Sequence, residues 1–162
     1  MADMFRPVPI EQEPKRKNRF VLEFPSELGI ESYLVQTASK PHIEINSVPV
    51  EYMNTTFYVA GKYKWSSMDI KFIDVIGPST TQKIMEWIRL HAESATGRMG
   101  YAVGYKKNLV LKALDPTGAE VEKWTLVGCF ITDGNFGEFD YSSDDLADVA
   151  ITIQPDLCLQ NA

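Results

Sequence analysis

The sequence has few of the residues on which disulfide frameworks and metal centres depend. Its 162 residues include only two cysteines and two histidines. Cys129 and Cys158 cannot form a disulfide framework between them, so free thiols are expected. The cysteines and histidines also lie far apart, without the spacing of a zinc site. We therefore predict no metal site and no bound cofactor.

The arrangements that support nucleophilic catalysis are also missing. The sequence contains no G-x-S-x-G, and neither cysteine stands in a signature context. His42 follows Pro41 in a predicted loop, and His91 falls on the apolar stripe of a predicted helix, where a packed or edge-exposed ring is expected. The glycines of GRMGYAVGY precede no Lys-Ser/Thr pair, so they do not indicate a phosphate-binding loop. The prediction is a protein that is not an enzyme.

Long apolar runs and an excess of basic charge are absent as well. No stretch of about 18 apolar residues is present, which argues against a membrane-spanning helix and against membrane binding. The N-terminus MADMFRPVPIEQEPKRK has no apolar signal core, so we expect the chain to stay in the cytoplasm in which it is made. The formal net charge of −6 disfavours specific nucleic-acid binding, because phosphate contacts require clustered Lys and Arg. The basic cluster from Lys15 to Arg19 is interpreted as a solvated approach to the first strand.

One acidic segment, DYSSDDLAD, contains four aspartates. It lacks the glycine and the terminal glutamate of an EF-hand loop. We interpret it as a solvated turn between two strands rather than as a calcium site.

What the sequence does contain is alternation of apolar and polar residues, which predicts strands over most of its length. The turn signal Asp115-Pro116-Thr117-Gly118 separates two of these segments and predicts a hairpin. The predicted strands are RFVLEF, SYLVQTAS, SSMDIKFID, NLVLKAL, EVEKWTLVGCFI and ADVAITIQ.

A single helix is predicted over 79–95, with Ser79 or Thr80 as its N-cap and Gly97 after its end. Its packing stripe contains Ile84, Trp87 and Ile88. One helix among about seven strands predicts a mainly β fold, an antiparallel β-barrel or sandwich with one packed α-helix. We expect a single domain over 19–162, preceded by an extended N-terminal arm over 1–18 that contains three prolines.

The segment VPVEYMNTTFYVAGKYKW, from Val48 to Trp65, contains five aromatic residues on a stretch broken by polar residues and glycine. Soluble monomers rarely expose so much aromatic surface. The segment either folds flat on its own core as a long hairpin or projects and is covered by another copy of the chain. Self-association is the favoured interpretation, because a head-to-tail contact can propagate.

Taken together, these segments resemble the tail tube proteins of contractile-tailed bacteriophages, and the resemblance covers most of the sequence. The aromatic segment and the helix with its central Trp87 are the most specific parts, and the order and spacing of the pieces carry the rest. In order, the pieces are NRFVLEF, QTASKP, IEINSVPVEYMNTTFYVAGKYKWSSMDIKFID, TQKIMEWIRLHAE, GYKKNLVLKAL and WTLVGCFITDGNFGEFDYSSDDLADVAITI.

The resemblance implies a tail-tube-like subunit that assembles into hexameric rings with a continuous inner β-barrel. Stacked rings would form a hollow conduit for DNA ejection inside a contractile sheath, in a virion tail assembled in the host cytoplasm. The implied partners are further copies of the chain, the tail sheath protein, and baseplate and tail terminator proteins. DNA would pass through the lumen without specific binding.

The resemblance also implies roles for particular residues. The hairpin loop over 48–64 would project to the adjacent ring, with Tyr52, Met53, Phe57, Tyr58 and Tyr63 as its contact residues.

Polar strand faces supply candidates for the lumen. They are Asp69, Lys71, Glu120, Glu122 and Asp148. An ordinary solvated outer face is an equal alternative for each acidic residue, because alternation does not say which sheet each strand joins.

Other interpretations remain open at this point. The same fold occurs in the tubes of type VI secretion systems and extracellular contractile injection systems. A baseplate tube-initiator is less favoured, because such proteins usually carry extra domains. A monomeric ligand-binding β-barrel, with the aromatic residues lining a pocket, is the alternative from another class, and a hydrolase is the least favoured.

Overall fold

The computed structural model describes residues 11–161, so residues 1–10 of the expected arm lie outside the described part. Within residues 11–161 the chain is mainly β, with antiparallel pairing throughout, as predicted. The strands are β1 (Phe20–Glu23), β2 (Val35–Ala38), β3 (Ile43–Tyr52), β4 (Thr55–Trp65), β5 (Met68–Ile73), β6 (Lys107–Leu114), β7 (Glu120–Asn135), β8 (Asp148–Gln154) and β9 (Leu157–Gln160). The helices are α1 (Thr80–Arg89) and the short α2 (Ala102–Tyr105), with single 3-10 turns at Ser26–Leu28 and Ser32–Leu34.

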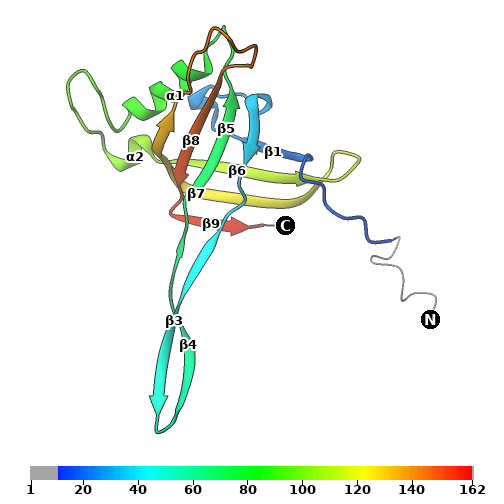
Figure 1. The fold of residues 1–162 in the computed structure, drawn as a ribbon, viewed down its shortest axis with the longest axis vertical. Coiled ribbons are helices and arrows are strands. Elements are labelled where there is room, and N and C mark those ends of the chain that lie inside the picture. Colours follow the sequence, from blue (N-terminus) through cyan, green and yellow to red (C-terminus); the bar gives the residue numbers. More distant parts are fainter. Residues whose placement is uncertain (1–10, 162) are drawn as a thin grey trace.

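The body is one sheet that folds over on itself. Its strand order is β1-β6-β7-β8-β5-β2, with β9 also paired to β7. The long strand β7 joins the two halves, because its first part pairs with β6 and β9 and its last part pairs with β8. In Figure 1 the β6–β7–β9 half runs across the β5–β8 half, so the inner faces of both halves can share one core.

The core lies between these halves and is closed at one side by α1. The alternation in β5 is exact, with Met68, Ile70 and Phe72 buried and the residues between them exposed. Ile84 and Trp87 of α1 are 0% and 1% exposed, and Ile88 is partly buried against the same cluster. The other fully buried members come mainly from β6, β7 and β8.

Helix α1 differs from its prediction at both ends. It ends at Arg89 rather than at residue 95, and Gly97 lies in a later turn with φ 69°. Ser79 occupies the N-cap position, but its hydroxyl does not cap the helix. Asp74 takes this role, because its carboxylate accepts hydrogen bonds from the Thr81 amide at 3.4 Å and the Thr81 hydroxyl at 2.9 Å. A carboxylate beside the first turn also complements the helix dipole.

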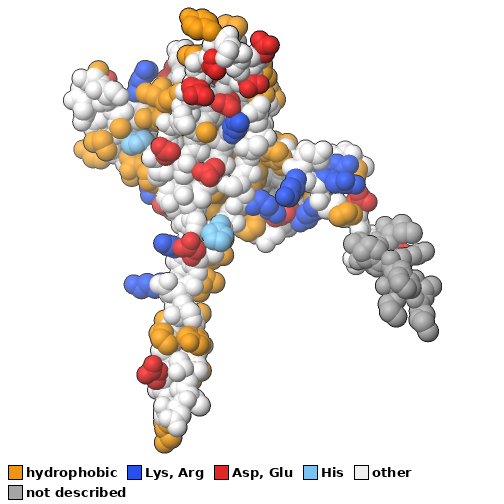
Figure 2. Space-filling model, viewed as in Figure 1, with side chains coloured by type: hydrophobic (Ala, Val, Ile, Leu, Met, Phe, Trp, Pro, Cys, Tyr) orange, Lys and Arg blue, Asp and Glu red, His pale blue; other side chains and the backbone are white. Residues whose placement is uncertain are grey.

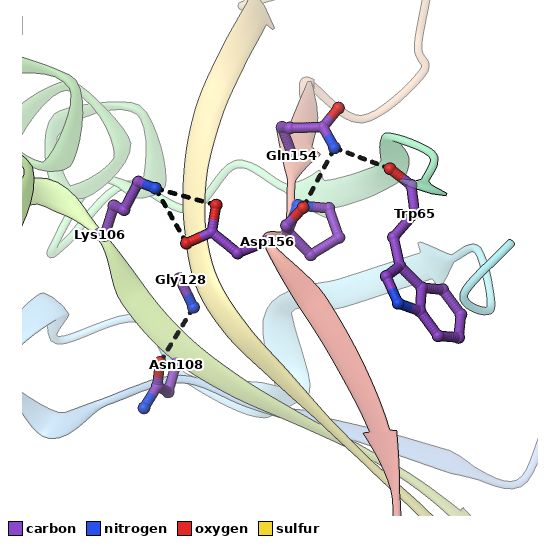
Figure 3. Close-up of polar contacts among 7 residues, drawn as sticks. Trp65, Lys106, Asn108, Gly128, Gln154 and Asp156 are labelled. Carbon is purple, nitrogen blue, oxygen red and sulfur yellow. Dashed lines mark hydrogen bonds and ion pairs between the residues drawn. The ribbon is translucent and has the colours of Figure 1, made fainter. Parts of the chain in front are cut away.

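The passage of β7 from one half to the other is fixed by a polar cluster, drawn in Figure 3. Gly128 has φ 68°, and a Cβ there would lie 2.2 Å from an Asp156 oxygen, so the bend requires glycine. The Gly128 amide donates to Asn108 Oδ1 at 3.1 Å, and Lys106 Nζ binds Asp156 at 2.9 Å. These contacts hold the bend against the start of β6.

Within residues 11–161 no helix has the length and apolar character needed to cross a membrane. The described chain thus consists of a folded β body with one long projection, formed by β3 and β4.

Candidate assembly surface

Strands β3 and β4 form a two-stranded sheet of their own that leaves the body as a long projection (Figure 1). Every residue of β3 is exposed, and so is every residue of β4 except Gly61 and Trp65. The two-residue turn at Met53 and Asn54 closes the hairpin, with Met53 at φ 52°. The paired strands are longer than the loop expected over 48–64.

All five residues expected to make contact between rings lie on this projection and are exposed. Their exposure runs from 54% at Phe57 to 86% at Met53, with Tyr52, Tyr58 and Tyr63 between these limits. The body therefore does not cover them, and the alternative of a hairpin folded flat on its own core does not hold for the single chain. The pocket of aromatic residues expected for a ligand-binding barrel is not formed by these side chains either.

Near the tip, one face of the hairpin is apolar except for Thr55, which pairs with Tyr52. Val48 pairs with Val59 and Val50 with Phe57, and alternation places Tyr52 on this face as well. The opposite face of the tip is more mixed, because Glu51 and Thr56 share it with Pro49 and Tyr58.

Near the base, the apolar residues lie on the other face. Here Ile43 pairs with Trp65 and Ile45 with Tyr63. The opposite face, which is the apolar one at the tip, carries the charged pair Glu44 and Lys64 at the base. The register shifts between Ile45 and Ser47, where β4 has one extra residue.

The bulge leaves little room for a side chain at Gly61. A Cβ on Gly61 would lie 2.8 Å from Val48 Cγ2 and 3.2 Å from the Asn46 carbonyl oxygen. A bulge increases the twist of a two-stranded ribbon, and the strands change sides between base and tip in Figure 1. The twist turns the apolar face of the tip toward the same side as the apolar face of the base. The hairpin therefore presents one apolar side along its length.

The base of the hairpin is anchored to the body by polar and aromatic contacts. Gln154 Nε2 donates to the Trp65 carbonyl oxygen at 2.9 Å (Figure 3). The Trp65 ring packs edge-on against Trp124 with centroids 6.2 Å apart, and the Ser66 amide donates to the His42 carbonyl oxygen at 2.9 Å. These contacts fix the direction in which the projection leaves the body.

Three of the lumen candidates lie together on the outer face of β5 and β8. Lys71 Nζ lies 2.9 Å from an Asp148 carboxylate oxygen, and Asp69 accepts a hydrogen bond from the Thr152 hydroxyl at 2.9 Å. This face is polar, but its acidic groups are partly paired.

The expectation that Glu120 and Glu122 share one polar face is wrong. Glu120 pairs with Leu114 and Glu122 with Ala113, so a bulge places Val121 between them and turns the two carboxylates to opposite faces. Glu120 stays outside and lies 2.6 Å from Lys112 Nζ. Glu122 points to the core side and is only 4% exposed, so it does not share the outer polar face with Glu120.

Glu122 forms an ion-pair cluster at the edge of the core. Its carboxylate lies 2.8 Å from both Lys15 Nζ and Lys40 Nζ and accepts a hydrogen bond from Trp124 Nε1 at 2.6 Å. The hydrogen bonds from Lys15, Lys40 and Trp124 lower the pKa of Glu122 to about 2. The cluster attaches the described part of the N-terminal arm to the body. The sequence analysis did not predict this contact, because it interpreted Lys15 as solvated.

The cysteines and histidines occupy positions that suit packing. Both cysteines are buried free thiols, and burial raises the pKa of Cys129 to about 12 and that of Cys158 to about 11. They stay protonated and are poor nucleophiles at neutral pH. The His91 ring packs 5.0 Å from Tyr105, while His42 is exposed beside Glu44. Residues 11–161 contain no group of three or more His, Cys, Asp or Glu placed to hold a metal ion.

The folded-over sheet, the packed helix and the projecting hairpin together define a tail-tube-like fold. A chain in the cryo-EM structure of the anti-feeding prophage tube-terminating cap matches with a TM-score of 0.75 and 19% identity, covering 100% of this chain and 99% of that chain. A chain of the sheath–tube complex of an extracellular contractile injection system, PVC, matches with a TM-score of 0.70 and 16% identity over 99% and 95%. Hcp1 from Flavobacterium johnsoniae matches with a TM-score of 0.55 and 10% identity over 88% and 94%.

The TM-scores show a shared fold, and at identities of 10–19% they show the fold alone. No family model matches the chain, and no curated protein sequence does either.

Proposed function

We propose that the chain is a structural subunit of the tube of a contractile injection machine or contractile tail, and that it has no catalytic role. The observation that carries the proposal is the long hairpin with one apolar side that its own body leaves uncovered. Each buried aromatic ring removes roughly 150–250 Å² from water, so covering several rings supplies a strong drive to associate. A second copy provides this cover in a head-to-tail contact, and such contacts build stacked rings.

Hexameric rings and a continuous inner β-barrel belong to this proposal. The unpaired edges of the body sheet, β1 and β2, support it, because strand edges in soluble proteins are paired or protected. The polar face with Asp69, Lys71 and Asp148 is a candidate for the lumen wall, and Glu120 is a candidate from the other half. Sheath, baseplate and terminator proteins are the partners that such a tube requires.

A tube-terminating cap subunit is the second candidate. It is favoured by the match to the anti-feeding prophage cap structure, which covers the whole of this chain. A repeating tube subunit forms long cylinders by itself, whereas a terminator stops at a single ring because one of its faces does not accept a further copy.

A phage tail tube and the tube of a secretion or injection system differ in the cargo that passes through the lumen. A phage tail tube conducts DNA, whereas the tube of a secretion or extracellular injection system need not. Passage of DNA through the lumen without specific binding predicts no binding of a labelled DNA duplex in fluorescence anisotropy at physiological salt, and tight binding would contradict that part of the proposal.

Electron microscopy of the purified full-length protein is the direct test of the function. The tube proposal predicts hollow cylinders in negative stain, and the cap candidate predicts single rings. Compact particles of one chain at every concentration would contradict both.

A further inference from the structure

A second exposed apolar set lies outside the hairpin, in the loop between β7 and β8. Phe139, Tyr141 and Leu146 in this loop are 97%, 113% and 73% exposed. The same loop, from Phe136 to Ala147, contains four carboxylates and no basic residue. Its carboxylates are Glu138, Asp140, Asp144 and Asp145. An acidic loop that exposes large apolar side chains needs a partner that is both apolar and basic.

The body carries a groove with these properties, between the unpaired edge strands β1 and β2. It encloses about 1180 Å³, and its walls include Leu22, Leu111 and Trp124 on the core side of the sheet. Tyr33, at its margin, is 78% exposed. The groove thus lies where β1 and β2, the two ends of the strand order, face each other.

Basic side chains surround the groove. Lys15, Arg16, Lys17 and Lys40 line it, and the only acidic residue among the described lining residues is Glu122, which pairs with Lys15 and Lys40. The net charge of this rim is therefore positive, with Arg16 and Lys17 as its main contributors. Lys112 of β6 also lines the groove, but its ammonium pairs with Glu23 and Glu120. In Figure 2 the basic side chains gather on the flank beside the arm, while acidic and apolar side chains gather at the end opposite the hairpin. The two surfaces are therefore complementary in charge and apolar character, but they lie on different parts of one molecule.

We propose that the loop Phe136–Ala147 of one copy docks into the groove between β1 and β2 of the next copy. The aromatic side chains of the loop enter the apolar groove, and its carboxylates meet the basic rim. Because the two surfaces differ, the contact is heterologous, and it closes a ring or continues as a helix. The proposal deepens the proposed function and rests on it: the hairpin joins successive rings, and the loop joins copies within a ring.

A second copy fits the groove better than a small ligand does. The groove adjoins two open strand edges, which soluble proteins pair or cover, and its rim carries an excess of positive charge that matches the loop. A docked neighbour would protect both edges, whereas a small apolar molecule would protect neither edge and would leave the acidic loop exposed.

A charge-exchange experiment on the full chain tests the contact. One variant carries Arg16→Glu and Lys17→Glu in the groove, and the other carries Asp144→Lys and Asp145→Lys in the loop. Each reversal sets like charges against each other, so we expect the protein concentration needed for half-assembly to rise about tenfold or more. Mixing the two variants, or combining all four changes in one chain, restores opposite charges and should restore rings in sedimentation velocity and negative stain.

Restoration is the decisive outcome, because a variant that merely fails to fold cannot be rescued by a second reversal. If both variants form rings as the wild type does, or if neither the mixture nor the combined variant regains them, the docking proposal is overturned. If the wild type itself never forms rings or tubes, the proposed function fails as well, so the two failures are distinguishable.

Cysteine cross-linking provides an independent measurement. The chain carrying both Tyr33→Cys and Phe139→Cys should give a ladder of disulfide-linked species under mild oxidation, with each step one chain higher. Each single variant is the matched control and should give at most a dimer. Absence of the ladder in assembled protein would contradict the contact.

Discussion

At the scale of single residues, Glu122 shows how one carboxylate joins distant segments. Lys15 from the arm, Lys40 after β2 and Trp124 in β7 all donate to it. The sequence could not predict this cluster. Simple alternation in EVEK places Glu120 and Glu122 on the same face, and only the bulge in β7 turns Glu122 inward. In contrast, the burial of Ile84 and Trp87 follows directly from their helical spacing.

The first prediction concerns the dependence of stability on pH. Because the folded-state pKa of Glu122, about 2, lies below its usual value of 4.5, its contribution is complete above about pH 4.5 and is lost as the pH falls toward 2. Glu122→Gln should lower the free energy of unfolding at pH 7 by about 1–3 kcal/mol. Urea unfolding at pH 7, 5, 4 and 3 measures both effects.

In this variant the loss of stability between pH 5 and 3 should be smaller than in the wild type. Glu138→Gln, at an exposed acid without such a cluster, is the matched control and should leave the profile unchanged. An unchanged profile in Glu122→Gln would show that the cluster does not stabilise the folded state.

Trp87 supports the second prediction. Its ring is 1% exposed, and its indole N–H donates to the Tyr105 carbonyl oxygen at 2.9 Å. Trp87→Ala should cost about 3–5 kcal/mol in the free energy of unfolding, as expected for truncation of a large core side chain. Tyr101→Ala, at an exposed aromatic residue nearby, is the control. Similar midpoints for both variants in urea would contradict the packing of α1 through this stripe.

At the scale of elements, most strands could be predicted and the hairpin could be predicted only in part. Alternation located β1, β5, β6, β7 and β8 because each has one face on the core. Strands β3 and β4 have no buried face in the single chain. Their apolar residues change faces between base and tip because the ribbon twists, so simple alternation does not describe them. The short strand β9 and helix α2 have too few residues for a period to emerge.

The third prediction separates the two sides of the hairpin tip. Phe57 lies on the apolar face with Val48, Val50 and Val59, whereas Tyr58 lies on the face that includes Glu51. Phe57→Ser should therefore reduce the length of stacked assemblies more than Tyr58→Ser does, and neither should change the free energy of unfolding. Particle lengths in negative stain and urea unfolding measure the two quantities. Equal effects on length would show that the hairpin is covered on both sides.

At the scale of the whole molecule, the described residues form a body with its own core and exposed apolar surfaces, for which we propose cover by a second copy. The fold class followed from the ratio of strands to helices and from the resemblance to tail tubes. The distribution of charge between the loop before β8 and the groove beside the arm could not be predicted. It depends on which strands lie at the edges of the folded sheet, and this is set by pairing between segments far apart in the sequence.

The proposed function depends on self-association through the hairpin, which sedimentation velocity measures in solution. The wild-type chain is compared over a wide concentration range with a chain in which Val48–Val59 is replaced by Asn-Gly, a turn suited to close the pair Ser47 and Ala60. The body should fold alike in both, because β3 and β4 share no sheet with it. The wild type should sediment as large assemblies that grow with concentration, and the shortened chain as single rings or smaller species. A wild-type chain that sediments as one folded monomer at high concentration would contradict the account.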